Sequence, residues 1–278
     1  MKRDARHRNA GMLAPMRFGR IATPEGMTFA VIDGEATTAK AIAGTPFTEP
    51  EYTGKEWPLD QVRLLAPTLP SKVVAVGRNY ADHVAEVFQQ SAEHLPPTIF
   101  LKPSTSVVGP GAPIKIPEFA TRVEFEGELA VVFGVPCKNV KAEDWKSVVR
   151  GVTIINDVSS RDLQFADGQW SRAKGIDSFG PLGPWIETDL DKFDFADLPI
   201  KARLTHDGRT ETKQDSNSNQ MIMNIGEMVE WVTQSFTMLP GDVMATGSPA
   251  GTAEMVPGDY IEIEIPGIGK LGNPVERA

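Results

Sequence analysis

Short apolar runs punctuated by glycine and proline dominate the chain. Residues 72–77 (KVVAVG) and 152–159 (VTIINDVS) are apolar enough to be buried strands, whereas residues 260–265 alternate Tyr, Glu and Glu with three isoleucines, as in a half-exposed hairpin strand. Few stretches carry apolar residues at helical spacing; residues 225–236 are the clearest, and residues 78–94 can also form a helix. The pattern predicts an α+β fold that is mainly β and argues against a doubly wound parallel sheet.

Turn-forming composition divides the chain into three parts. Residues 1–15 are basic but lack the apolar core of a secretory signal, so we expect a disordered leader. Residues 16–70 contain short alternating runs, the tight-turn signal Asp33-Gly34 and several prolines, which predicts a small β-rich N-terminal domain that ends in a linker. Residues 71–278 carry the buried-type strands and the charged motifs, and are expected to form the larger, functional domain.

Composition narrows the classes of function. The 278 residues carry a formal net charge of −9, which is unfavourable for gripping a phosphate backbone, so no nucleic-acid partner is expected. Cys137 is the only cysteine, which excludes a disulfide within the chain and argues against a cysteine-based zinc site. No apolar run approaches the roughly 20 residues that cross a bilayer. We therefore expect a soluble protein of the reducing cytoplasm without a membrane partner.

Acidic residues recur at every second position in the segment VEFEGELAVVFG. On one strand Glu124, Glu126 and Glu128 would point to the same face, and the apolar residues that follow indicate that this strand is buried. Asp157 follows a second strand of the buried type. Buried like charges repel each other, and a divalent cation is the simplest way to offset that cost; these oxygen donors suit Mg²⁺ or Mn²⁺. The alternative is an edge strand whose acidic face is solvated.

Two further charged positions are candidates for catalysis. His83 and Glu86 share a face of the helix predicted after Asn79, its expected N-cap, and a carboxylate beside an imidazole favours a general base. The alternative is an ordinary surface pair. Lys174 lies among small and aromatic residues, where it either balances an anionic substrate or is simply exposed. EF-hand, P-loop, GxGxxG and G-x-S-x-G motifs are absent from the sequence.

Taken in order, these segments resemble the fumarylacetoacetate hydrolase family. The resemblance rests on VVAVGRNYADHVAE, PTIFLKPSTSVVGPG, VEFEGELAVVFG, GVTIINDVSSRDLQ, WSRAKGIDSFGPLGPWI and MATGSPAG, which follow one another over residues 72–252. It implies a mixed β-sandwich roll for the catalytic domain of residues 71–278, with a divalent metal at its mouth, a short helical lid, a small N-terminal cap domain and assembly as a homodimer.

The resemblance also implies roles by position. The expected metal ligands are Glu126, Glu128 and Asp157, while Glu124 falls where the family often has an acid that is not a ligand. His83 and Glu86 match a catalytic dyad on the lid. The remaining positions expected to act in catalysis or to contact substrate are Lys174, Arg161, Gln164 and Thr246.

Family members act on 2-oxo acids, whose keto and carboxylate oxygens can chelate a cation that stabilises a pyruvate enolate. Decarboxylation of oxaloacetate to pyruvate and CO₂ is the first expectation. The alternatives are hydrolysis of an acylpyruvate, with the dyad deprotonating water, and isomerisation or tautomerisation by proton transfer alone. Hypotheses of another class are a metal-dependent binding protein without catalysis and a structural oligomer module. If the carboxylates crowd one pocket, Glu126→Gln or Asp157→Asn should stabilise the metal-free fold.

Overall fold

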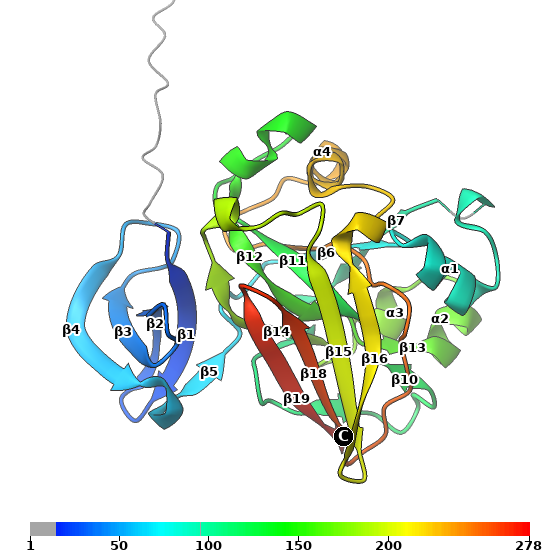
Figure 1. Cartoon of the computed structure of the whole chain (residues 1–278), viewed down its shortest axis with the longest axis horizontal. Helices are drawn as coiled ribbons and strands as arrows, with labels where there is room; N and C mark the ends of the chain where they lie inside the picture. Colours follow the sequence, from blue (N-terminus) through cyan, green and yellow to red (C-terminus); the bar gives the residue numbers. More distant parts are fainter. Residues whose placement is uncertain (1–14, 95) are drawn as a thin grey trace, which may run out of the picture.

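The computed structural model describes residues 15–94 and 96–278, and its main regular elements are strands in three sheets (Figure 1). The predicted α+β, mainly β fold is confirmed. The leader predicted over residues 1–15 lies outside the described residues apart from Pro15. The first strands occupy one end of the molecule, and the helices α1 and α2 lie at the other (Figure 1).

The N-terminal strands form a meander. Their bounds are β1 (Arg17–Thr23), β2 (Gly26–Ile32), β3 (Thr38–Ala43), β4 (Glu51–Pro58) and β5 (Arg63–Leu65). They enclose a small core around Ile21, Ala30 and Ile32. The strand β1 also pairs with β14 of the larger part, through Arg17 opposite Glu187 and Phe18 opposite Ile186. The meander therefore extends the main sheet, and the domain boundary near residue 70 stays a prediction.

The main sheet runs in the order β4-β3-β2-β1-β14-β12-β11-β17-β6-β7. Its pairs are antiparallel except that β17 runs parallel to β6 and the short β8 runs parallel to β14. Every residue of β11 and β14 is buried, as expected for central strands covered on both faces. The bounds of these strands are β6 (Val73–Gly77), β7 (Thr98–Lys102), β8 (Val107–Val108), β11 (Gly127–Phe133), β12 (Val149–Asn156), β14 (Gly180–Glu187) and β17 (Val243–Ala245).

A second sheet packs on the first. Its order is β16-β15-β18-β19-β9, and β18 alternates exposed or half-buried residues with buried ones, as its sequence predicts. Its inward isoleucines share one core cluster with Leu129 and Val131 of β11, so the two sheets form a sandwich. The bounds are β9 (Ile114–Ile116), β15 (Pro199–His206), β16 (Arg209–Asn217), β18 (Tyr260–Ile265) and β19 (Gly269–Arg277), and a separate pair is formed by β10 (Val123–Glu124) and β13 (Ser159–Ser160).

Helices flank the sheets. The α-helices are α1 (Ala81–Phe88), α2 (Arg161–Asp167), α3 (Ser171–Lys174) and α4 (Ile225–Ser235). The short 3₁₀ helices are η1 (Leu59–Gln61), η2 (Ala92–His94), η3 (Ser104–Ser106), η4 (Ala142–Ser147), η5 (Leu190–Lys192) and η6 (Ser218–Gln220). Asn224 and Glu227 form a capping box that starts α4. In the part of the chain that the structure describes, no helix has both the length and the apolar character needed to span a membrane.

The helix predicted within residues 78–94 is shorter than expected. It begins after Tyr80 and ends at Phe88, because Gln89 adopts a left-handed conformation with φ of 53°. The expectation that Asn79 caps this helix is wrong. Its side chain instead donates to the carbonyls of Met223 (3.0 Å) and Thr246 (2.9 Å), and so ties the start of the helix to two distant loops.

Asp162, at the start of α2, anchors the loop before β10. Its carboxylate accepts hydrogen bonds from the Ser160 hydroxyl (2.5 Å) and the Thr121 amide (3.0 Å). Burial acts to raise the pKa of Asp162, but the bonds from Ser160 and Thr121 outweigh it and lower that pKa to about 2. Since this lies below the ordinary value of about 3.9, the stabilisation is complete above that value and is lost as the pH falls towards 2.

We therefore expect Asp162→Ala to lower the free energy of unfolding at pH 7 by about 1 kcal/mol, allowing for solvent screening. The loss should shrink when the measurement is made near pH 3, because the wild-type carboxylate is then partly protonated in the unfolded chain. Urea denaturation of both proteins at the two pH values measures this, with Asp60→Ala, at an exposed position of η1, as control. An equal loss at both pH values would contradict the argument.

Candidate active site

Three acidic residues converge where β11 and β12 lie side by side. Glu126 directly precedes β11, Glu128 lies on it, and Asp157 directly follows β12. The register places Gly127 opposite Asn156, and the Asp157 amide donates to the Glu126 carbonyl at 2.8 Å. One carboxylate oxygen from each acidic residue lies within 4.8 Å of the others, and all three side chains are buried. The solvated edge strand considered above is therefore wrong for these residues.

Glu124 does not join this acidic cluster (Glu126, Glu128 and Asp157). The expected single strand is broken at residues 125–126, where the chain passes from the small β10–β13 pair to the main sheet. Glu124 instead accepts from Arg161 Nε at 2.7 Å and pairs with Arg122 at 2.6 Å. The three glutamates therefore do not share one strand face, although their period-two spacing predicts it.

Two buried lysines neutralise part of the acidic cluster. Lys174 Nζ lies 2.7 Å from Glu126, 2.8 Å from Asp157 and 2.6 Å from the Ser159 hydroxyl. Lys102 Nζ lies 2.5 Å from the other oxygen of Asp157 and also donates to the Lys174 carbonyl. Burial acts to lower the pKa of Lys174, but Asp157 and Glu126 outweigh it and raise that pKa. Lys174 is thus a buried cation inside the site and not an exposed side chain.

Arg161 is fully engaged inside the protein. It is buried, and besides Glu124 its guanidinium contacts Glu126 Oε1 at 2.6 Å and Gln164 Oε1 at 2.8 Å. Burial acts to raise the pKa of Glu126, but the Lys174 and Arg161 cations outweigh it and hold that pKa well below its usual range. The structure therefore shows Arg161 paired with Glu124 and with Glu126 of the acidic cluster. Its predicted contact with substrate stays a prediction.

Glu128 is the carboxylate that lacks a cation. Its Oε2 accepts from the Gly247 amide at 2.8 Å, and no basic side chain among residues 15–94 and 96–278 lies within 4.0 Å of it. Burial, followed by repulsion from Asp157 and Glu126, raises the pKa of Glu128 well above its ordinary value. A buried set of three hard oxygen donors, one of them uncompensated, fits a divalent cation such as Mg²⁺ or Mn²⁺.

The helix α1 brings His83 and Glu86 to the acidic cluster. His83 Nε2 lies 3.6 Å from Glu126 Oε1, and its Nδ1 lies 3.4 Å from Glu86 Oε2. Burial acts to lower the pKa of His83, but Glu126 and Glu86 outweigh it and raise that pKa. Glu86 accepts in turn from the Gly251 amide at 3.1 Å. An imidazole between two carboxylates, one oriented by a loop amide, is arranged for proton transfer.

The other predicted substrate contacts are held by the protein itself. Gln164, on α2, is buried and accepts from Arg161. The Thr246 hydroxyl donates to the Leu129 carbonyl at 2.9 Å, which pins the loop that presents the Gly247 amide to Glu128. Sequence reasoning gave no role to Lys102, although it lies in the matching segment PTIFLKPSTSVVGPG. Nothing in that segment indicates that its side chain reaches Asp157.

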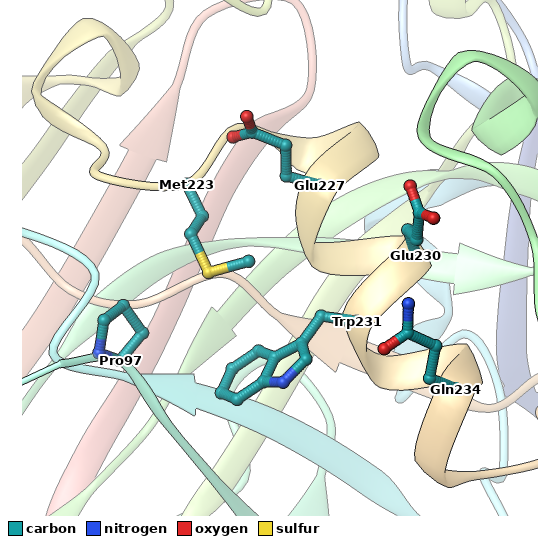
Figure 2. Close-up of a pocket in the computed structure, with 6 residues that line it drawn as sticks. All are labelled: Pro97, Met223, Glu227, Glu230, Trp231 and Gln234. Atoms are coloured by element: carbon teal, nitrogen blue, oxygen red, sulfur yellow. The ribbon is translucent and has the colours of Figure 1, made fainter.

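A groove of about 330 Å³ lies along α4, away from these residues. Figure 2 shows its lining: Met223 and Trp231 face Pro97, and carboxylates of the helix lie at the rim. None of the residues that line it belongs to the acidic cluster or to α1. The chemistry that the sequence predicts is therefore not located there.

Comparison with known proteins places the chain in a family. The family model described as "Fumarylacetoacetate (FAA) hydrolase C-terminal" matches residues 72–276, and the model described as "Rv2993c-like, N-terminal" matches residues 16–67. The chain belongs to the fumarylacetoacetate hydrolase family, and the resemblance inferred from its sequence is confirmed.

Two curated relatives cover most of the chain. Protein Rv2993c of Mycobacterium tuberculosis is 51% identical over 267 residues, which are 94% of this chain and 98% of that protein. The mitochondrial oxaloacetate tautomerase Fahd2a of Rattus norvegicus is 40% identical over 227 residues, which are 78% of this chain and 71% of that protein.

Solved structures share the fold. A structure of Cg1458 with an inhibitor is 75% identical, with a TM-score of 0.93 over 95% of this chain and 100% of that one. The maleylpyruvate hydrolase of Sphingobium sp. SYK-6, in complex with manganese (II) and pyruvate, is 28% identical, with a TM-score of 0.76 over 95% of this chain and 100% of that one. The family thus includes enzymes of small oxo acids.

Proposed function

We propose that the chain is a divalent-metal-dependent enzyme of a 2-oxo acid, and that its reaction is the decarboxylation of oxaloacetate to pyruvate and CO₂. The observation that carries this proposal is the buried acidic cluster facing His83, whose other ring nitrogen lies beside Glu86. Manganese and pyruvate in the Sphingobium hydrolase support the metal and the substrate class, and the name of the rat relative supports oxaloacetate.

The proposed roles follow the contacts. Glu126, Glu128 and Asp157 would hold Mg²⁺ or Mn²⁺. The positive charge of the ion would polarise the oxygens of a 2-oxo acid and so stabilise negative charge that develops at its carbon 3. Lys174, already between Glu126 and Asp157, adds a fixed positive charge beside the substrate carboxylate. These side chains are buried, so charge interactions within the site are weakly screened.

Decarboxylation needs no water. The bond between carbons 3 and 4 of oxaloacetate breaks, its electron pair stays on carbon 3, and CO₂ leaves. A proton must then reach carbon 3 to give pyruvate. His83 is placed to donate it, because its Nε2 faces the acidic cluster while Glu86 lies at its Nδ1.

Tautomerisation of oxaloacetate is the second candidate. The rat relative, 40% identical over 78% of this chain, bears that name. The same dyad would move a proton between carbon 3 and the keto oxygen without breaking a carbon–carbon bond. Hydrolysis of an acylpyruvate and isomerisation of a hydroxydiene-dioate remain alternatives on the same residues. We also propose that the protein acts in the cytoplasm as a homodimer, and that its N-terminal domain ends near residue 70.

A substrate panel tests the reaction. Protein stripped with a chelator and reloaded with Mg²⁺ or Mn²⁺ is mixed with oxaloacetate, acetylpyruvate, maleylpyruvate, fumarylpyruvate or fumarylacetoacetate. We expect CO₂ and pyruvate from oxaloacetate well above the rate with metal alone, and no excess with Asp157→Asn. Loss of the enol without CO₂ would favour the tautomerase. Cleavage of acetylpyruvate without oxaloacetate turnover would favour the hydrolase.

A further inference from the structure

The helix α1 is attached at two sharp turns. Arg78 before it and Gln89 after it are both left-handed, with φ of 63° and 53°. Such conformations are unfavourable for residues other than glycine, so surrounding contacts must maintain them. Within the helix only His83 and Val84 are buried. Something besides core packing must therefore hold this short helix in place over the acidic cluster.

The hydrogen bonds of Asn79 and Glu86 supply part of that hold, and an aromatic contact at the end of the helix adds to it. The Arg78 Cζ lies 5.0 Å from the Phe88 ring centroid and 5.1 Å from that of Trp170. The two rings are nearly parallel, with 15° between their planes and 6.0 Å between centroids. Arg78 Nε is buried without a hydrogen-bond partner in the described part of the chain, so the ring faces take that place.

Trp170 is fixed on its other side. A Cβ on Gly77 would lie 2.3 Å from Trp170 Cζ3, so the indole fits against β6 only because residue 77 is glycine. Phe100 of β7 meets the indole edge-on at 5.3 Å. The Lys174 amide donates to the Trp170 carbonyl at 3.0 Å, and Lys174 Nζ lies 5.8 Å from the indole ring. Trp170 thus contacts both the helix that carries the dyad and the lysine of the site.

We propose that Trp170 is a positioning residue: with Arg78 and Phe88 it forms a latch that keeps α1 closed over the acidic cluster and ties its position to Lys174. Only the catalytic consequence of this latch rests on the proposed function. The latch itself concerns the free protein, so it can be tested without any substrate.

Hydrogen exchange read by mass spectrometry tests the latch in the full-length protein. We expect Trp170→Ala and Phe88→Ala each to speed exchange of the α1 amides about tenfold, while Trp170→Phe, which keeps a ring, restores most of the protection. Phe119→Ala is the matched control, because Phe119 is 58% exposed and lies outside the latch. Peptides of β15 and β18 should not change. Unchanged exchange of α1, or faster exchange everywhere, would overturn the proposal.

Kinetics add a second readout if oxaloacetate is turned over. If α1 is open more often, a smaller fraction of the protein molecules is competent to bind substrate. Phe88→Ala should therefore raise KM about tenfold and change kcat little. A fall in kcat at constant KM would contradict a latch. If no substrate of the panel reacts, the proposed function fails, whereas the exchange experiment still decides the latch.

Discussion

Glu128→Gln should abolish the stabilisation of the protein by Mg²⁺ or Mn²⁺ without lowering the melting temperature of the metal-free protein. The reason is that Glu128 is buried with one amide donor and, among the residues that the structure describes, no cation within 4.0 Å, so its negative charge is a cost that an amide removes. In the variant, the side-chain oxygen of the glutamine can still accept the hydrogen bond that the Gly247 amide donates. Glu126→Gln should behave in the opposite way, because Lys174 and Arg161 would lose a buried partner.

Thermal melts of both variants, with and without saturating metal, measure this. For Glu126→Gln the free energy of unfolding of the metal-free protein should fall by about 3 kcal/mol. For the wild type, metal at about 100 times its dissociation constant should add roughly 2.7 kcal/mol, and neither variant should show that gain. A metal-free Glu128→Gln protein that melts well below the wild type would contradict the assignment of the uncompensated charge.

His83→Ala should lower turnover by about 10² to 10⁴-fold and leave the metal-induced rise in melting temperature intact. His83 faces the acidic cluster from α1 but is not one of the three residues that could hold the metal, so His83→Ala should affect proton transfer and leave metal binding intact. Steady-state kinetics on the reactive substrate of the panel, together with thermal melts, provide the measurement.

The matched control for that variant is His94→Ala. His94 is exposed in η2, a few residues beyond the same helix, and should be neutral in both assays. Turnover that survives His83→Ala would remove the dyad from the mechanism. Metal binding without any turnover in the wild type would support the other class of function, a metal-dependent binding protein.

The sequence predicts the parts of this molecule that local patterns encode. Uninterrupted apolar runs mark the central strands, alternation marks β18, and helical spacing marks α4. The acidic residues of VEFEGELAVVFG and Asp157 after the next buried strand predict an acidic site there, whereas the choice of Glu126, Glu128 and Asp157 as its members comes from the resemblance to the family. The resemblance to a family adds the dyad, which the spacing of His83 and Glu86 alone cannot distinguish from a surface pair.

What the sequence does not predict depends on contacts distant in the chain. Asn79 is a good N-cap by type, yet its amide bonds to loops more than 140 residues away. Glu124 fits the alternation, but a break in the strand turns it to Arg161. The crowding expected from the sequence for Glu126→Gln or Asp157→Asn takes no account of Lys174 and Arg161, which pair with Glu126, so the structure leads us to expect the larger charge cost at Glu128.

The attachment of α1 at two left-handed residues has a consequence for engineering. Both groups that the helix contributes to the site lie between Arg78 and Gln89, whereas the three clustered carboxylates lie on β11 or directly beside the ends of β11 and β12. We therefore expect that residues 79–88 can be exchanged between relatives and carry His83 and Glu86 with them, while Trp170 and the three clustered carboxylates stay those of the recipient.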